Sequence, residues 1–203
     1  MVAHYTAAKK RRSEDFYSPG KRTGLRPDRA TIVYANRARE AFGSEIPIVI
    51  GGLEASLRRF AHYDYWDDKV RRSVLVDSGA DILVYGMGET ASREIARRLK
   101  KKIPVSEMRD IRGTAILTHS PDDCAFESVT LPSFADVCDS RRFYADATRL
   151  EYAEHDPVRG RALIQEHDGR YLIVNPPAMP LETKELDRVA ELPYTKQYHP
   201  MYE

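Results

Sequence analysis

Two short apolar segments, each followed by a glycine turn, constrain the fold of this chain more than any other feature. Residues 46–50 (Ile-Pro-Ile-Val-Ile) lead into Gly51-Gly52, and residues 80–85 (Ala-Asp-Ile-Leu-Val-Tyr) lead into Gly86-Met87-Gly88. Both are too short for a helix and almost wholly apolar, which is typical of buried strands in a parallel sheet. Residues 114–118 predict a third strand, at the sheet edge because it is polar at both ends.

Helices are predicted between these strands. Residues 29–42 have helical spacing of apolar positions, with Asp28 as the cap and Gly43 as the end, and residues 69–77 and 90–102 show similar patterns. Strand, helix, strand, helix, strand indicates an α/β domain with parallel strands, over residues 28–118. A ligand site in such a sheet lies beyond the carboxyl ends of the strands.

The two ends of the chain differ from this central domain. Residues 1–27 are rich in Lys and Arg, and they can be interpreted either as a basic arm for RNA or as a solvated connector. Residues 119–203 predict a mostly helical connector, with helices at 133–154, 158–166 and 182–191 and one strand at 171–174. We expect this connector to pack against another body.

Composition excludes several classes of protein. The chain has 203 residues and a net charge of +1, so nucleic acid is not expected as a general partner. Hydrophobic residues make up 42% of it, so disorder of the whole chain is not expected. Two cysteines, far apart, predict free thiols and a cytoplasmic location. A signal peptide, a membrane span and metal-ligand spacings such as HExxH are absent from the sequence, so no metal ligand is assigned.

The glycine turns follow neighbouring strands and therefore predict one shared crevice. Glycine permits positive φ and close approach of a ligand to the backbone, and N–H groups at a following helix start favour anions. Neither turn is a complete dinucleotide fingerprint. Glu54 and Glu89 follow the two turns at corresponding places, where a carboxylate can accept hydrogen bonds from a ribose, although Glu89 can equally cap the next helix.

The segment after the first turn is rich in cations and aromatic residues. Such residues can stack on a base or another flat ligand, and His62 with Asp64 could transfer a proton. The alternative is a loop packed by its own aromatic side chains. No catalytic residue is assigned. The candidate ligand-binding residues are Gly51, Gly52, Glu54, Ser56, Arg58, Arg59, His62, Tyr63, Asp64, Tyr65, Trp66, Gly86, Gly88 and Glu89.

Several motifs together resemble a known family. They are Arg-Pro-Asp-Arg-Ala-Thr at 26–31, Gly-Gly-Leu-Glu-Ala-Ser-Leu-Arg-Arg at 51–59 with Ala-His-Tyr-Asp-Tyr-Trp at 61–66, Arg-Arg-Ser-Val-Leu-Val-Asp at 71–77, Leu-Pro-Ser-Phe at 131–134, Asn-Pro-Pro-Ala-Met-Pro-Leu at 175–181 and Leu-Pro-Tyr at 192–194. In this order they resemble the N-terminal region of the YgiQ-type radical S-adenosylmethionine (radical SAM) proteins.

The resemblance implies a longer protein. Its N-terminal part would be a Rossmann-like domain similar to flavodoxin and to cobalamin-binding domains, with a partial parallel sheet. A downstream barrel would hold a [4Fe–4S] cluster on a CxxxCxxC motif and bind S-adenosylmethionine. This sequence does not contain that motif, and it lacks the DxHxxG loop that supplies a histidine to cobalamin in related domains. We therefore expect neither the cluster nor cobalamin on this chain itself.

Two hypotheses follow for function. In the first, the chain is the accessory part of a radical SAM enzyme, inactive by itself, with the barrel as its partner. In the second, it is a free-standing flavodoxin-like module that binds a nucleotide or small anion at the glycine turns, or RNA through the basic N-terminal segment. The substrate is not specified by either.

Overall fold

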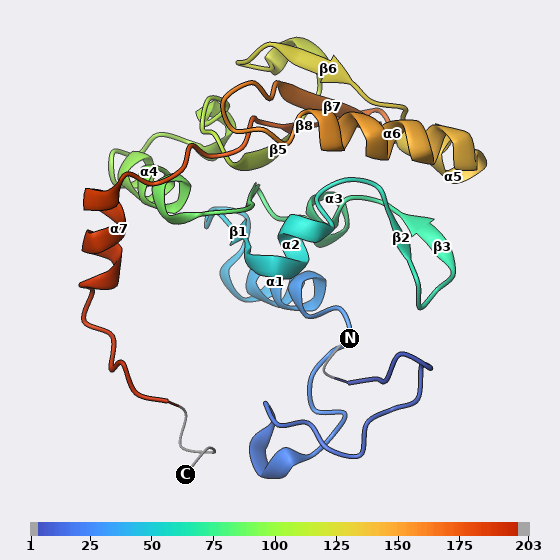
Figure 1. Ribbon diagram of the computed structural model, residues 1–203, viewed down its shortest axis with the longest axis vertical. Coiled ribbons are helices and arrows are strands. Elements are labelled where there is room, and N and C mark those ends of the chain that lie inside the picture. The colour runs from blue at the N-terminus through green and yellow to red at the C-terminus, as the bar shows by residue number, and fades with distance from the viewer. Residues whose placement is uncertain (1–3, 199–203) are drawn as a thin grey trace.

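A six-stranded mixed sheet organises the protein in the computed structural model, which describes residues 4–198 (Figure 1). The strand order is β1-β4-β5-β8-β7-β6. The β1–β4 and β6–β7 pairs are parallel, and the three pairs between them are antiparallel. The α/β class predicted from the sequence is confirmed. The strands are β1 (Val49–Ile50), β4 (Ile82–Val84), β5 (Thr114–Thr118), β6 (Ser128–Thr130), β7 (Ala162–His167) and β8 (Arg170–Val174).

Helices cover both faces of the sheet because successive side chains of the strands point to opposite faces. On one face, Leu83 and Leu172 belong to a core shared with α1 (Ala30–Phe42), α2 (Gly52–Leu57) and α3 (Val74–Ser78). On the other, Ile82, Val84 and Ile173 pack with α4 (Glu89–Lys100) and with Met108. Two hydrophobic cores therefore hold the strands between layers of helix.

The predicted edge position of residues 114–118 is wrong, and so is their parallel direction. β5 lies inside the sheet, antiparallel to both β4 and β8. Its polar ends are satisfied internally: Thr114 Oγ1 donates to the Ile111 carbonyl at 2.6 Å, and Thr118 Oγ1 donates to the Ser120 carbonyl at 2.8 Å. A threonine at a strand end can thus be buried once its hydroxyl has a backbone acceptor.

The helix predicted at 158–166 is also wrong, since most of that segment is strand β7. β7 and β8 form a hairpin whose turn residues Asp168 and Gly169 have φ of 52° and 80°. The first four residues of β7, starting at Ala162, are all buried, and such an uninterrupted buried run is typical of a strand covered on both faces. With β6, these strands continue the sheet beyond residue 118, the boundary predicted between domain and connector.

Two predicted helices are interrupted. Residues 133–154 form α5 (Phe134–Asp139) and α6 (Arg141–Ala153), separated at Ser140, whose φ of −134° is extended and whose hydroxyl accepts from the Arg142 N–H. Residues 69–77 begin as strand β3 (Lys69–Arg71), which pairs antiparallel with β2 (His62–Asp64) before α3 starts. Hydroxyl groups at Ser140 and Ser73 cap the helices that follow.

Asp28 does not cap α1, contrary to the prediction. The N-cap position is Arg29, and the Asp28 carboxylate instead accepts from the Tyr5 hydroxyl at 2.9 Å and lies 2.9 Å from His4 Nδ1. The helix ends predicted at Gly43 and Gly79 are confirmed, with φ of 73° and 63°.

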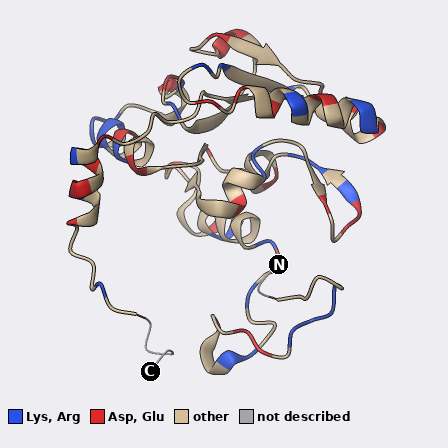
Figure 2. Ribbon diagram, in the orientation of Figure 1, with Lys and Arg blue, Asp and Glu red and all other residues tan. Residues whose placement is uncertain are grey.

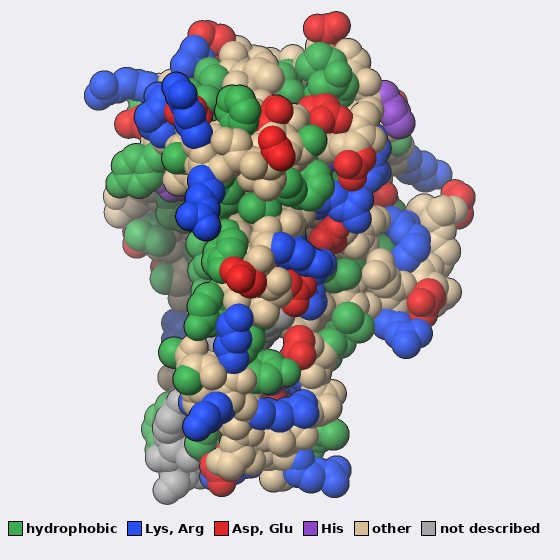
Figure 3. Space-filling model, turned by 90° about the vertical axis from the view of Figure 1, so that its right-hand side faces the viewer, with side chains coloured by type: hydrophobic (Ala, Val, Ile, Leu, Met, Phe, Trp, Pro, Cys, Tyr) green, Lys and Arg blue, Asp and Glu red, His purple; other side chains and the backbone are tan. Residues whose placement is uncertain are grey.

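The remaining elements lie around the sheet. α7 (Thr183–Ala190) stands beside α4 at one end of the molecule, and the β2–β3 hairpin projects at the other (Figure 1). Short 3-10 turns occur at Pro19–Lys21, Val105–Glu107 and Pro121–Asp123. Charges of both signs are interspersed over the ribbon and over the face seen in Figure 3 (Figures 2 and 3). Within residues 4–198, no helix has both the length and the apolar character needed to cross a membrane.

Candidate functional site

The two glycine turns meet at the carboxyl ends of β1 and β4. A hollow of about 520 Å³ is lined there by residues of both turns and of the first turn of α4. The structure thus brings together five of the candidate residues, Gly51, Gly52, Gly86, Gly88 and Glu89. Sequence reasoning missed four other lining residues, Val49, Ile50, Val84 and Ser92. Ser92 could have been found from its position one helical turn after Gly88.

The glycines are required for two different reasons. Gly52 and Gly86 have φ of 83° and 66°, a conformation that side chains with a Cβ rarely adopt. A Cβ at Gly88 would lie 2.9 Å from Val84 Cγ1, and one at Gly51 would lie 3.3 Å from the Val84 carbonyl oxygen. Four of the nine residues that line the hollow are these glycines, so no side chain of their own covers the main chain there.

Ser56 joins the two turns. Its hydroxyl donates to the Gly52 carbonyl at 2.9 Å and accepts from the Gly86 N–H at 3.2 Å. Glu54 serves a different contact: its carboxylate accepts from Thr31 Oγ1 at 2.7 Å and from Arg58 at 3.2 Å. Glu54 therefore links α2 to α1 through Thr31 and is paired with Arg58 at the end of its own helix, and neither side chain lines the hollow.

Arg59 lies against the carboxyl end of β4 in a half-buried position. Its guanidinium packs on the rings of Phe60 and Tyr85, with centroid distances of 4.9 and 4.8 Å, and donates to the Ser56 carbonyl at 2.5 Å. Its buried Nε has no hydrogen-bond partner among the described residues. Burial lowers the pKa of Arg59.

A half-buried carboxylate on α6 interacts with this guanidinium. Burial raises the pKa of Glu151 from 4.5 to about 7, although the positive charge of Arg59 acts in the opposite direction. No local sequence signal indicates this pair, because Glu151 lies in the predicted helix at 133–154 and Arg59 lies far away in the sequence.

Asp64 is a structural carboxylate of the β2–β3 hairpin. It is 2% exposed and accepts from Arg29 and from the Trp66 N–H, both at 2.9 Å. Burial alone would raise the pKa of Asp64, but these hydrogen bonds lower it. His62 Nδ1 lies 3.1 Å from the Phe60 carbonyl oxygen, and burial lowers the pKa of His62. The two side chains thus have separate partners, and the contacts do not favour a proton transfer between them.

The aromatic side chains of the hairpin contact the basic N-terminal segment of the same chain. The Trp66 ring lies 4.6 Å from that of Tyr5, and Lys9 Nζ lies 4.4 Å from the centroid of Tyr65. Lys9 also donates to the Trp66 carbonyl at 3.3 Å. Tyr63 donates from its hydroxyl to Asp68 at 2.5 Å. These contacts correspond to the alternative of a loop packed by its own aromatic residues.

The cysteines do not fit an iron–sulfur cluster of the radical SAM type. Such a cluster needs three thiolates at close spacing, whereas this chain has two cysteines. Cys124 is half-buried and Cys138 is exposed, and both are free. Within residues 4–198, no three His, Cys, Asp or Glu residues are grouped so that they could hold a metal ion.

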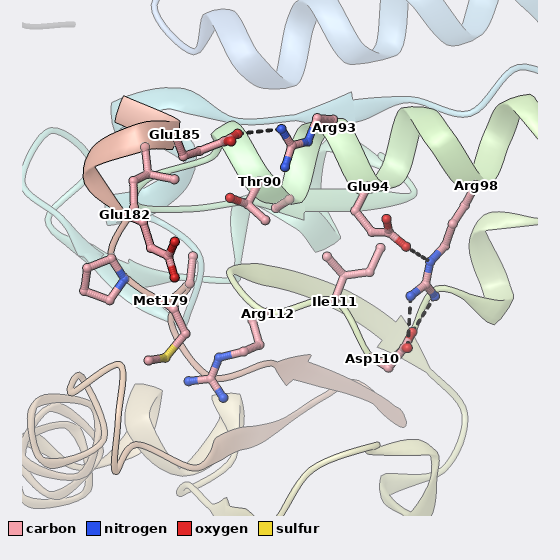
Figure 4. A pocket seen from close by; sticks show the side chains of 14 residues that line it. Thr90, Arg93, Glu94, Arg98, Asp110, Ile111, Arg112, Met179, Glu182 and Glu185 are labelled. Carbon is pink, nitrogen blue, oxygen red and sulfur yellow. Dashed lines mark hydrogen bonds and ion pairs between the residues drawn. The ribbon is translucent and has the colours of Figure 1, made fainter. Parts of the chain in front are cut away.

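A second hollow, of about 470 Å³, lies on the other side of the first turn of α4 (Figure 4). Its walls come from α4, residues 110–112 and residues 178–185. Two ion pairs border it, Arg98 with Asp110 and Arg93 with Glu185, each at 2.5 Å. Thr90 and Ala91 line this hollow, whereas Glu89 and Ser92 line the strand-end hollow. The first turn of α4 therefore lies between the two hollows.

Comparison with known proteins places the chain in a family. The family model described as "Radical SAM N-terminal" matches residues 1–203. A UPF0313 protein of Clostridium perfringens (strain SM101) is 56% identical over all 203 residues, which make up 30% of that protein. A UPF0313 protein of Clostridium botulinum (strain 657) is 49% identical over the same length, 32% of its own. No solved structure matches.

The chain therefore spans about a third of the length of the curated relatives that it matches. The family match covers the motifs at both ends of the chain as well as the two glycine turns between them. This chain belongs to the Radical SAM N-terminal family.

Proposed function

We propose that this chain is the N-terminal accessory domain of a YgiQ-type radical SAM protein and is not catalytic by itself. The observation that carries the proposal is the family match over the whole chain, together with its coverage of only 30% of a close relative. The barrel with the CxxxCxxC motif, the [4Fe–4S] cluster and the S-adenosylmethionine site would lie in the downstream part of the relatives. The substrate stays open.

The donor set of this chain supports that division of labour. A radical SAM cluster uses three thiolates and leaves one iron open for its cofactor. Cys124 and Cys138, one half-buried and one exposed, cannot supply that set. Their free thiols agree with the cytoplasmic setting that we propose for the protein, because reducing conditions keep thiols unpaired there.

Iron–sulfur reconstitution tests the proposal. The 203-residue chain and the full-length Clostridium perfringens relative are each incubated anaerobically with iron and sulfide, and 5′-deoxyadenosine is measured after addition of S-adenosylmethionine and a reductant. We expect a stoichiometric cluster and 5′-deoxyadenosine from the relative and neither from the 203-residue chain. A cysteine-dependent cluster on the short chain, or no cleavage by the full-length relative, would refute it.

The strand-end hollow favours a second role, the binding of a nucleotide or small anion. Four of its nine lining residues are glycines, and Glu89 adds a carboxylate that can accept from ribose hydroxyls. Titration with ATP, GTP and inorganic phosphate tests this role. Glu89→Gln should weaken nucleotide binding about tenfold if its carboxylate meets the ribose. Glu94→Gln is the matched control, because Glu94 accepts from Arg97 and Arg98 on another side of α4.

A further inference from the structure

α7 (Thr183–Ala190) is a helix without a buried residue. Its apolar residues Leu186, Val189 and Ala190 are spaced i, i+3, i+4 and so lie along one side. Leu186 is 55% exposed. An eight-residue helix has little stability in water on its own, because helix nucleation costs more than so few hydrogen bonds return. α7 therefore needs a packing partner for its apolar side.

The rest of the described chain gives α7 little support. Glu185 accepts from Arg93 of α4 at 2.5 Å and from Arg188 at 2.7 Å. The Arg93 side chain is 52% exposed, and ion pairs of this kind contribute only about 0–1 kcal/mol. Figure 4 shows Glu185 and Arg93 meeting at the rim of the second hollow, with Met179 and Glu182 on the same side. α7 borders this hollow and does not fill it.

Exposed apolar side chains continue after the helix. Leu192, Tyr194 and Tyr198 are 44%, 61% and 68% exposed. Large apolar side chains exposed one after another along a segment are typical of a surface that binds another protein body. In the Clostridium perfringens relative, more than two thirds of the polypeptide lies outside the region that this chain matches. A packing partner of sufficient size is therefore available within the same polypeptide of the relatives.

We propose that α7 and residues 191–198 bind the downstream region, with the apolar side of α7 buried against an apolar surface of that region. This inference rests on the proposed accessory function. Glu185 would keep its contact with Arg93, and Lys184, about half a helical turn away from Leu186, would stay in solvent. α7 thus joins the two parts, one through an ion pair and the other through its apolar side.

The position of α7 connects this interface to the candidate site. α7 is bound to Arg93 of α4, and the first turn of α4 lines both hollows. A downstream region seated on α7 would lie next to the second hollow, and the first turn of α4 separates that hollow from the strand-end hollow.

Hydrogen exchange in the full-length Clostridium perfringens relative tests the interface. The segment aligned with Thr183–Ala190 is compared between the unmodified protein, Leu186→Asp and Lys184→Asp, each made at the aligned position. Both variants add an aspartate to α7, but Lys184→Asp adds it in the first helical turn, where a negative charge is favourable, and on the side away from Leu186. We expect exchange of this segment to become about tenfold faster with Leu186→Asp and less than about twofold faster with Lys184→Asp.

Three results would overturn the inference. The first is equal exchange of this segment in all three proteins, and the second is an equal effect of both variants. The third is a dimer of the 203-residue chain, seen by light scattering, with the α7 amides protected in it, since a second copy would then be the occupant. Exchange of α4 amides near Ile95 shows whether Leu186→Asp is still folded; if it is not, Leu186→Ser replaces it under the same criteria.

The same samples separate this inference from the proposed function. Release of 5′-deoxyadenosine without protection of the α7 segment would refute the interface and retain the radical SAM role. Protection of the segment without cleavage of S-adenosylmethionine would retain the interface and refute that role.

Discussion

Glu151→Gln should make the protein more stable at pH 8. Burial raises the pKa of Glu151 from 4.5 to about 7. Because this folded-state pKa is above the unfolded value, the associated stability is fully present below pH 4.5 and is lost as the pH rises to about 7. At about 1.4 kcal/mol per pKa unit, the loss is about 3 kcal/mol, and somewhat less because the side chain is partly exposed. Glutamine resembles the protonated form and avoids the loss.

Urea unfolding of the 203-residue chain at several pH values between 4.5 and 8 measures this effect. The difference in unfolding free energy between variant and parent should grow from near zero at pH 4.5 to about 2–3 kcal/mol at pH 8. Glu154→Gln is the control on the same segment: hydrogen bonds from Arg161 lower the pKa of Glu154, so its loss should destabilise the protein at pH 8. A Glu151→Gln variant that is equal to or less stable than the parent at pH 8 would refute the reasoning.

Three further predictions concern other parts of the fold. His167 is fully buried and burial lowers its pKa to about 4, so stability should fall as the pH drops from 6.5 to 4; His167→Gln should remove that part of the acid sensitivity in the same urea series. Gly88→Ala should lower the melting temperature by several degrees, equivalent to about 1–2 kcal/mol, because the new Cβ would lie 2.9 Å from Val84 Cγ1; an unchanged melting temperature would contradict the packing at that turn. Trp66→Ala should speed tryptic cleavage of the N-terminal segment, because it removes the ring that contacts Tyr5, and equal cleavage rates would mean that this contact does not hold the segment.

The strand–glycine–helix units were predictable because their signals are local. Residues 114–118 were placed correctly as a strand for the same reason, and Gly43 and Gly79 end their helices as predicted. Each of these assignments depends on a few neighbouring residues whose backbone preferences agree with the fold.

The arrangement of the sheet was not predictable in the same way, since it depends on distant partners. The position of β5 follows from β8, whose residues pair with it from Ala115↔Val174 to Thr118↔Tyr171. Strand β7 was read as a helix because a short apolar run fits both periods. Ser140 interrupts the helix predicted at 133–154, and that break depends on a single extended residue.

For the candidate site, the glycine turns predicted its position correctly, whereas the long side chains were not predictive of their own contacts. Backbone turns at Gly51-Gly52 and Gly86 fix where the hollow lies. The contacts of Arg59 and Asp64 could not be predicted from the sequence, because their partners, Tyr85 and Arg29, come from other elements. Long charged side chains reach several neighbours, and only the tertiary structure selects one.

The pairing of β5 with β8 also determines when this domain can fold during synthesis. β5 leaves the ribosome long before β8, so until residue 174 has emerged one side of β5 has unpaired N–H and C=O groups. Contacts between residues so far apart in sequence also form slowly. A nascent chain that pauses after residue 118 would therefore present an open strand edge to other chains, and this interval is when a chaperone would protect it best.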